Sequence, residues 1–210
     1  MFERYGAQNW WPAQTAFECV VGAILTQNTA WTNVEKAIAQ LKSETEITPG
    51  KIDKMPAAKL ARLIKPSGYF NQKARRLKIF ARFVARDYGG NIGALLTEET
   101  GKLRKILLAL EGIGPETTDS IILYAAEKPV FVIDAYTKRI ASRHGFAPQS
   151  ASYGEAQELF AVNLPRETEL FNEYHALIVR TAKQFCHKKE PDCENCPLKN
   201  DLTHSGATHP

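Results

Sequence analysis

The chain has 210 residues, 44% of them hydrophobic, and a formal net charge of +4 at pH 7. This length suffices for one sizeable core or for two small lobes. The mild excess of basic residues suits an anionic partner but does not identify one. No apolar stretch is long enough to cross a membrane, and the first residues lack the pattern of a signal peptide. We therefore expect a soluble, unexported protein of the cytoplasm.

Helical periodicity dominates the sequence. Apolar residues recur with the spacing of one helix face within 17–25, 34–41, 60–64, 74–88, 103–110, 156–164 and 170–179. Only 130–133 looks strand-like, and it is too short to pair into a sheet. The sequence therefore predicts an all-α fold.

All three tryptophans lie near the N-terminus, at Trp10, Trp11 and Trp31. The first two precede a predicted helix, and Trp31 follows a polar turn that contains Gln27. Burial in a core is the ordinary role of tryptophan, and we expect it for at least one of the three. Gln27 and its neighbour Asn28 fit equally well as exposed turn residues.

Residues 67–77, SGYFNQKARRL, predict a turn followed by a basic helix. Gly68 and Tyr69 lie in the turn, and Lys73 is the first of several cationic side chains. A charge run of this kind is most often a solvated helix face.

Residues 110–116, LEGIGPE, predict a tight turn between two helices. Gly112 and Gly114 bracket Ile113, and Pro115 occupies a first helical turn, where a missing N–H is tolerated. Without side chains on the glycines, N–H groups at the start of the second helix can approach a phosphate, and the helix dipole favours the anion. The pattern predicts a phosphate-binding hairpin, with Thr117 in its second helix.

Asp134 follows a buried apolar connector, 129–133, and precedes another predicted helix. On its own, an aspartate in this place is most simply a helix N-cap.

Together these segments resemble a family. A hairpin of the form L-x-G-I-G, followed by an apolar run and an aspartate, is similar to the DNA glycosylases of the endonuclease III superfamily. The segments LTQNT at 25–29 and SGYFNQKARRL, together with a C-terminal cysteine cluster, have the order and spacing that this family uses. The resemblance covers nearly the whole chain. Within the superfamily, WWP and QNTAW resemble the 3-methyladenine glycosylase III branch.

The resemblance implies a two-lobed helical fold. One lobe, 27–126, is a central bundle that ends in the helix-hairpin-helix. The other combines 1–26 with 127–210 and carries Asp134 and the cysteine loop. The groove between the lobes holds double-stranded DNA that contains a damaged base, and the protein is expected to act there as a monomer near the nucleoid.

The implied reaction is excision of a flipped base by hydrolysis of its N-glycosidic bond. Asp134 matches the aspartate that stabilises positive charge on the sugar and orients water. Bifunctional relatives carry a lysine two residues after the second hairpin glycine, whereas this chain has Glu116 there. A carboxylate cannot form an imine, so we predict a monofunctional enzyme. Lys128 and Lys138 are near enough in sequence to leave weak lyase activity open.

The family also assigns roles to the other segments. Trp10 and Trp31, with Trp11 beside them, are expected to stack on the base, and a cationic alkylated purine gains cation–π attraction there. Gln27 fills the gap left in the duplex. The turn at Gly68 and Tyr69 wedges into the opposite strand. The remaining expected DNA contacts are Lys73, Gly112, Ile113, Gly114 and Thr117. His175, Asp119 and Lys199 are candidates for supporting positions, although satisfied polar groups in a helical core are commoner.

Cys186, Cys193 and Cys196 follow C-x6-C-x2-C, the first part of the family's iron–sulfur loop. The fourth cysteine position is Leu202. The three thiols suggest a metal loop, in which Asp201 or His204 completes a [4Fe-4S] cluster, or His204 completes a zinc site. A loop that folds without metal is the alternative.

Two other functions remain open from the sequence. An oxidised-pyrimidine or mismatch glycosylase with AP-lyase activity shares the hairpin and the aspartate. A non-catalytic DNA-binding protein can use the hairpin for phosphates alone.

Overall fold

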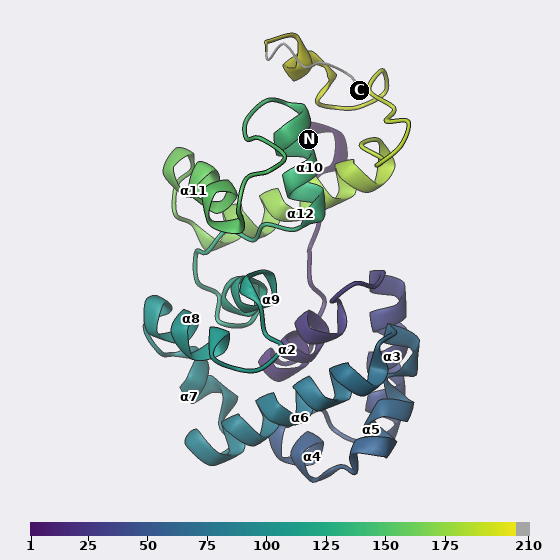
Figure 1. The fold of residues 1–210 in the computed structure, drawn as a ribbon, viewed down its shortest axis with the longest axis vertical. Helices are drawn as coiled ribbons and strands as arrows, with labels where there is room; N and C mark the ends of the chain where they lie inside the picture. Colours follow the sequence, from purple (N-terminus) through teal and green to yellow (C-terminus); the bar gives the residue numbers. More distant parts are fainter. Residues whose placement is uncertain (205–210) are drawn as a thin grey trace. The chain divides into compact units, whose positions relative to one another are not determined.

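The structure is a computed structural model that describes the backbone of residues 1–204 and the side chains of residues 1–201. Every regular element in that part of the chain is a helix, as predicted. The chain forms two compact units (Figure 1). Trp11–Lys128 make up one, here called the hairpin unit. Met1–Trp10 and, within the described chain, residues 129–204 make up the other, the aspartate unit.

The boundaries differ from the expected ones at the N-terminal side. We expected residues up to 26 to join the C-terminal half of the chain, but helix α2 (Ala16–Leu25) belongs to the hairpin unit. Residues 17–25 of this helix are all buried. A helix that is apolar on every side must be surrounded by other helices, and α2 packs against neighbours throughout the hairpin unit.

Helix α6 (Phe70–Asp87) is the longest element of the hairpin unit, and it buries one face that includes Leu77, Phe80 and Val84. Helices α4 and α5 pack against α6, and α2 also contacts it (Figure 1). The other elements of the unit are α3 (Trp31–Glu44), α4 (Pro49–Lys54), α5 (Ala57–Leu63), η1 (Lys65–Ser67), α7 (Ile92–Leu96), α8 (Thr100–Leu108), α9 (Pro115–Ser120) and the π-helical turn η2 (Ile121–Ala125).

The aspartate unit contains α1 (Phe2–Tyr5), α10 (Ala135–Arg143), α11 (Tyr153–Asn163), α12 (Thr168–Gln184) and η3 (Lys199–His204). Helix α10 packs against α12. The apolar connector before α10 is buried at 131–133, as expected, and forms no strand. Phe131 stacks on Phe160 of α11 with ring centroids 4.2 Å apart, and its ring meets Phe171 of α12 edge-on.

The N-terminal segment is held on α12 by polar contacts. The Gln8 main-chain N–H donates to both carboxylate oxygens of Glu173, at 3.0 and 3.1 Å. Arg180 donates to the Gln8 side-chain oxygen at 2.9 Å. These bonds join the two ends of the chain within one unit although 165 or more residues separate them.

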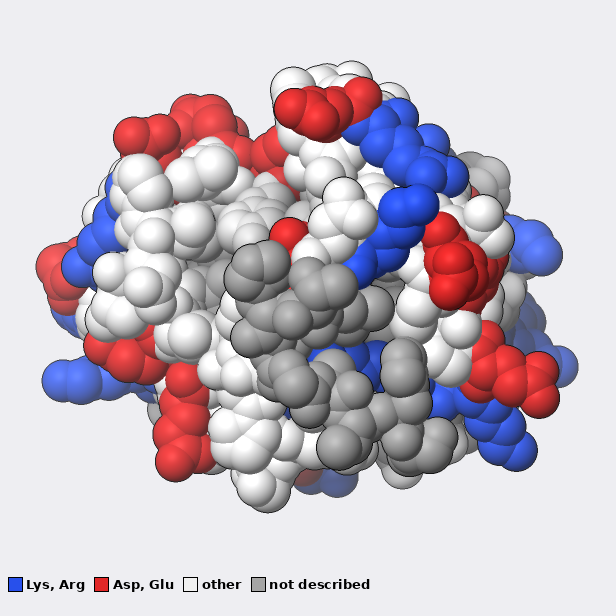
Figure 2. Space-filling view, turned by 90° about the horizontal axis from the view of Figure 1, so that it is seen from above, with Lys and Arg blue, Asp and Glu red and all other residues white. Residues whose placement is uncertain are grey.

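None of the described helices combines the length and apolar character needed to cross a membrane. In the space-filling view of Figure 2, acidic and basic side chains are interspersed on the visible face. That face therefore shows no single field of one sign.

An ion pair with a buried carboxylate and a partly exposed arginine joins the two helices of the hairpin. Arg104 of α8 donates from Nε and Nη2 to the two oxygens of Asp119 in α9, at 2.7 and 3.0 Å. The Asp119 carboxylate is fully buried, which gives this residue a structural role in the hairpin unit.

We expect Arg104→Met to lower the free energy of unfolding by about 3 kcal/mol, because it leaves a buried carboxylate without its cation. Arg75→Met is the matched control, since the Arg75–Glu111 pair is exposed on both sides and should contribute less than about 1 kcal/mol. Urea unfolding of both variants measures the difference. Equal losses would contradict the role assigned to the buried pair.

Candidate active site and nucleic-acid interface

The predicted hairpin lies between α8 and α9. Gly112 has φ +80°, a conformation that favours glycine, and Gly114 is the N-cap of α9. Ile113 is buried, and its N–H donates to the Leu110 carbonyl at 3.1 Å. The Ile113 side chain therefore anchors the turn in the core, while the glycines on either side of it are exposed.

Gln27 is bonded to this hairpin. Its Nε2 donates to the Gly112 carbonyl at 3.1 Å and to the Thr117 hydroxyl at 2.8 Å. Arg76 of α6 donates to the Gln27 Oε1. A Cβ at Gly112 would lie 2.4 Å from the Arg76 Nε, so the missing side chain makes room for the guanidinium group. Three of the predicted DNA contacts thus form one network, organised by an arginine that the sequence did not single out.

Thr117 does not present its side chain to solvent. It is only 6% exposed, and its hydroxyl accepts the hydrogen bond from Gln27. Its position supports the hairpin from within, and a direct phosphate contact from the Thr117 side chain does not fit this burial.

The turn before α6 has the backbone that its sequence suggested. Gly68 and Tyr69 both have positive φ, at 68° and 44°. Tyr69 is 65% exposed, which makes it one of the most exposed large hydrophobic side chains of the described chain. A bulky residue in the left-handed region is uncommon, and here it leaves the Tyr69 ring exposed.

Lys73 lies differently from the prediction. Its side chain is 1% exposed and donates to two main-chain carbonyls. Burial lowers the pKa of Lys73 to about 8, with a smaller effect from the nearby charge of Arg76. A phosphate contact by Lys73 does not fit this position, because its ammonium group lies in the interior of the hairpin unit.

An aromatic cluster forms in the hairpin unit. Trp11 stacks on Tyr124 with ring centroids 4.5 Å apart and planes 12° from parallel. The ring centroids of Trp31 and Trp11 are 5.0 Å apart, and the two ring planes make an angle of 57°. Both indoles lie over Gly22 of α2, where a Cβ would be 3.5 Å from each. The structure therefore brings together Trp11 and Trp31, two of the three predicted aromatics.

Tyr124 is the aromatic residue that the sequence analysis missed. It lies in η2, where the π-helical turn shifts side chains relative to a regular helix, and such turns are frequent at functional sites. In the sequence, Tyr124 is a single aromatic residue between Leu123 and Ala125. Such a residue in an apolar helix is most simply predicted to pack in the core. The contact with Trp11 spans more than a hundred residues and is not visible in any local pattern.

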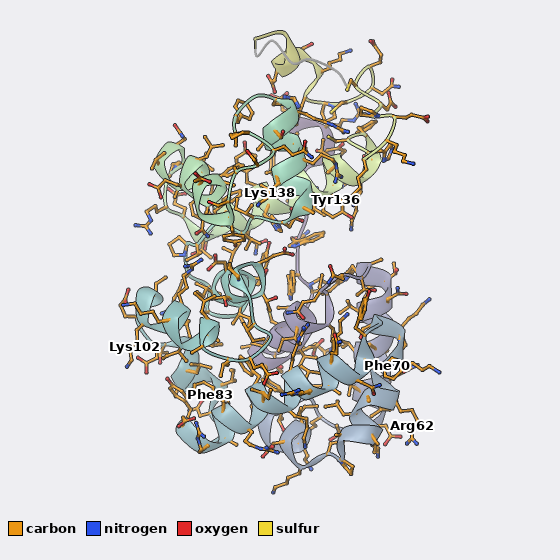
Figure 3. All side chains as sticks on the ribbon, in the orientation of Figure 1. Arg62, Phe70, Phe83, Lys102, Tyr136 and Lys138 are labelled. Atoms are coloured by element: carbon orange, nitrogen blue, oxygen red, sulfur yellow. The ribbon has the colours of Figure 1, made fainter. Side chains whose placement is uncertain are left out.

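Trp10 belongs to the aspartate unit. The Lys183 ammonium group lies 5.9 Å from the centroid of its ring, and from that of Tyr136 as well. Tyr136 and Lys138 are labelled on α10 in Figure 3.

Asp134 is the N-cap of α10. Its Oδ1 accepts a hydrogen bond of 2.7 Å from the Thr137 N–H, and its Oδ2 lies 3.7 Å from the His175 Nε2 of α12. Burial raises the pKa of Asp134, but His175 and the Thr137 N–H outweigh it and hold the pKa below its ordinary value. The site thus keeps a negative charge in a largely buried place, next to a histidine.

The position where a Schiff-base lysine would stand carries Glu116, exposed in the first turn of α9. The two lysines considered as substitutes are both engaged elsewhere. Lys128 donates to the Glu98 carbonyl, and Lys138 donates to the Ala151 carbonyl at 3.0 Å.

The cysteine loop is held by arginines of α10. Arg139 donates to the Cys186 carbonyl at 2.6 Å, and Arg143 donates to the carbonyls of His187 and Lys188. Arg143 also donates to the Cys186 sulfur at 3.1 Å. Cys186 and Cys196 are buried, and Cys193 is partly exposed.

Among the described residues, three thiols are the ligands that this loop offers for a cluster. Only three cysteines are present in the loop, and no group of three metal-binding side chains comes together among the described residues. Asp201 is exposed, while the side chains of Leu202 and His204 lie outside the described part.

The sequence matches the model of the HhH-GPD superfamily of base excision DNA repair proteins over residues 21–166. A protein of Methanocaldococcus jannaschii, provisionally named a DNA repair glycosylase, is 50% identical over 200 residues, which are 95% of this chain and 90% of the relative. Endonuclease III of Thermotoga maritima is 30% identical over 184 residues, covering 88% of this chain and 81% of that protein.

Solved structures show the same fold. The 3-methyladenine DNA glycosylase of Helicobacter pylori, bound to 1,N6-ethenoadenine, matches with a TM-score of 0.75 and 29% identity over 85% of this chain and 90% of that one. A non-covalent complex of endonuclease III with DNA matches with a TM-score of 0.81 and 22% identity, covering 95% and 88%.

The glycine hairpin, the aspartate that caps the next long helix and the all-helical fold define a DNA N-glycosylase of the helix-hairpin-helix class. The chain belongs to the HhH-GPD superfamily of base excision DNA repair proteins. Its partner is DNA.

Proposed function

We propose that this protein is a monofunctional glycosylase that removes alkylated purines such as 3-methyladenine from double-stranded DNA. The observation that carries the monofunctional part is Glu116, at the place where a lyase would need an amine. Without an amine there, water is the nucleophile, and the product is an intact strand with an abasic site.

In this proposal Asp134 acts on the sugar. Breaking the glycosidic bond develops positive charge there, and an ionised carboxylate stabilises it. The lowered pKa of Asp134 supports this role, because the side chain stays charged at neutral pH. We assign to Oδ2, which lies next to His175, the second role of accepting a proton from the attacking water. His175 is then a positioning residue for Asp134.

Recognition of the base is assigned to the aromatic residues. Trp11 and Tyr124 already touch each other, so a base stacks on the outside of this pair or against Trp31 rather than between them. An indole face attracts a cationic alkylated purine more than a neutral base. The likeness to a 3-methyladenine glycosylase supports the same substrate class. Trp10, which lies in the aspartate unit, stays a prediction as a base-stacking residue.

We assign the contacts with DNA to the hairpin and to two side chains of the same unit. The hairpin at Gly112 and Gly114 binds a phosphate with its main-chain N–H groups. The exposed Tyr69 enters the strand opposite the lesion, and Gln27 fills the gap that the flipped base leaves. To do so, Gln27 exchanges its hydrogen bonds to the hairpin for bonds to the orphaned base. We expect the protein to act as a monomer in the cytoplasm.

Base release from short duplexes tests the proposal. Each duplex carries one lesion, and products are analysed with and without hot alkali. Release of 3-methyladenine with strand breaks only after alkali is the expected result. Breaks without alkali would overturn the monofunctional assignment, and release of oxidised pyrimidines alone would overturn the substrate class.

A glycosylase for oxidised pyrimidines with lyase activity is the second candidate, favoured by the 30% identity to endonuclease III. The same experiment separates the two, since that candidate predicts breaks on oxidised pyrimidines without alkali.

Trp31→Ala should weaken excision of a cationic alkylated base, with little effect on binding to undamaged DNA. Stacking of one base on an aromatic side chain contributes about 1–3 kcal/mol, so kcat/KM should fall by roughly tenfold to a hundredfold. Single-turnover excision and equilibrium binding measure the two effects.

Phe83→Ala is the matched control for Trp31→Ala. Phe83 lies toward the C-terminal end of α6, away from Phe70 at its start (Figure 3), and packs on Tyr88 with ring centroids 5.6 Å apart. This variant removes an aromatic pair of the same unit outside the proposed pocket. If both variants lose excision equally, Trp31 serves the fold rather than the base.

A further inference from the structure

Lys73 holds together two segments of the hairpin unit that are far apart in sequence. Its Nζ donates to the Leu25 carbonyl at 2.8 Å and to the Ser67 carbonyl at 2.6 Å. Leu25 is the last residue of α2, and Ser67 is the last residue of η1. The side chain is 1% exposed, so both bonds lie in the interior.

Each of these carbonyls immediately precedes a segment with a proposed role in opening the duplex. Leu25 is two residues before Gln27, and Ser67 is two residues before Tyr69. Carbonyls at a helix C-terminus lack partners within the helix and attract a cation. One ammonium group therefore binds the carbonyls at the ends of both helices, α2 and η1, and fixes the distance between these ends.

The choice of residue is informative because a buried ammonium group is unfavourable for stability. Desolvation of a charged group opposes folding, and the pKa of Lys73, lowered to about 8, reflects that opposition. An apolar side chain of similar length avoids the desolvation but cannot donate to either carbonyl. The arrangement thus favours a defined geometry over maximal stability.

We propose that Lys73 is a positioning residue that sets the separation of the Gln27 and Tyr69 segments, and through it the extrusion of the damaged base. This inference rests on the proposed roles of those two residues. Both segments must meet one base pair from opposite strands, so an error in their spacing is an error in the flipping step. Hydrolysis of the glycosidic bond itself is the proposed role of Asp134, and Lys73 has no part in it.

Extrusion of the base and cleavage of its bond can be measured separately. A lesion paired with thymine must be unpaired before excision, whereas a lesion opposite an abasic site has no partner base to leave. Lys73→Met should therefore lose at least roughly tenfold more activity on the paired lesion than on the unpaired one, because unpairing costs free energy that only correctly spaced duplex-opening segments offset. A general loss of stability would lower both rates alike.

Lys78→Met is the matched control. Lys78 lies on the same helix and also donates to main-chain carbonyls, those of Ile52, Asp53 and Met55. Those carbonyls lie at the end of α4, outside both duplex-opening segments. The control should lower excision of the two lesions equally if it lowers it at all.

Single-turnover excision from both duplexes tests this, using wild type, Lys73→Met and Lys78→Met of equal helicity by circular dichroism. If Lys73→Met does not fold, Lys73→Gln replaces it, since the shorter amide cannot reach both carbonyls. Equal loss on both duplexes, or the same selective loss in Lys78→Met, would overturn the inference.

A second readout keeps this test separate from the proposed substrate. The fluorescence of 2-aminopurine next to a tetrahydrofuran abasic analogue reports unstacking on binding and needs no excision. If wild type releases no alkylated base, the substrate proposal fails while this signal still tests Lys73. Wild type and Lys78→Met should raise the fluorescence, and an equal rise with Lys73→Met would overturn the inference.

Discussion

Asp134→Asn should lose base excision by roughly 10²- to 10⁴-fold while it still binds DNA. Asparagine is nearly the same size and caps a helix as well as aspartate does, so the bond to the Thr137 N–H can persist. What disappears is the negative charge that stabilises the sugar cation and the oxygen that accepts a proton from water. Single-turnover excision measures the loss, and affinity for an abasic-site duplex measures the binding.

Glu99→Gln is the control for this substitution. Glu99 is another carboxylate N-cap, which accepts hydrogen bonds of 2.9 Å from the N–H groups of Gly101 and Lys102. Those bonds hold its pKa below the ordinary value, like that of Asp134. Since Glu99 caps α8 within the hairpin unit, its neutral variant should excise bases at the wild-type rate. If Asp134→Asn also retains activity, its carboxylate serves only as a cap.

The Asp134 helix cap and the hairpin glycines could be predicted from the sequence, because each depends only on residues nearby in the chain. Asp134 follows a buried run and precedes a helix, and it caps that helix in the structure. The hairpin glycines were predicted from their spacing, and Gly112 has a positive φ, which favours glycine. Caps and turns of this kind can be predicted from the sequence because a few adjacent residues determine them.

The prediction that Lys73 is exposed was wrong because it relied on the charge of the side chain. Its place in the run KARRLK suggested a solvated helix face, but Leu77, Phe80 and Val84 follow it at helical spacing and are all buried. Periodicity therefore puts Lys73 on the apolar face of α6. Read by period rather than by charge, the sequence would have indicated a buried lysine, although not its two carbonyl partners.

The aromatic cluster and the Gln27 network could not be predicted in this way. Gln27 bonds to residues 85 and 90 positions away, and no local pattern reports such a contact. The place of Tyr124 depends on a π-helical turn, which changes the register of a helix without a sequence signature. Trp11 takes a positive φ of 68°, an uncommon backbone for a tryptophan. These are outcomes of tertiary packing.

Gly112→Ala should weaken DNA binding by roughly tenfold to a hundredfold, because charge-assisted hydrogen bonds to a phosphate contribute about 1.5–3 kcal/mol each. The new Cβ would lie 2.4 Å from the Arg76 Nε and within 2.8 Å of two of its carbons, so the arginine must move. Its bond to Gln27 is then lost, and the Gln27 bond to the Gly112 carbonyl is disturbed with it. Affinity for a duplex with an abasic-site analogue, at fixed salt concentration, measures the effect.

Gly90→Ala separates the clash from the backbone strain. Gly90 has φ +82°, close to the value at Gly112, but a Cβ there meets nothing within 4 Å. Both variants should lose about 1 kcal/mol of stability to urea through the strain of a left-handed alanine. Gly112→Ala adds the clash with Arg76 to this loss, and only Gly112→Ala should bind DNA more weakly. The double variant Gly112→Ala, Arg76→Ala removes the clash, and any stability that it regains over Gly112→Ala measures that contact. If Gly90→Ala reduces affinity as much, strain alone explains the loss and the hairpin contact with Arg76 has no part in it.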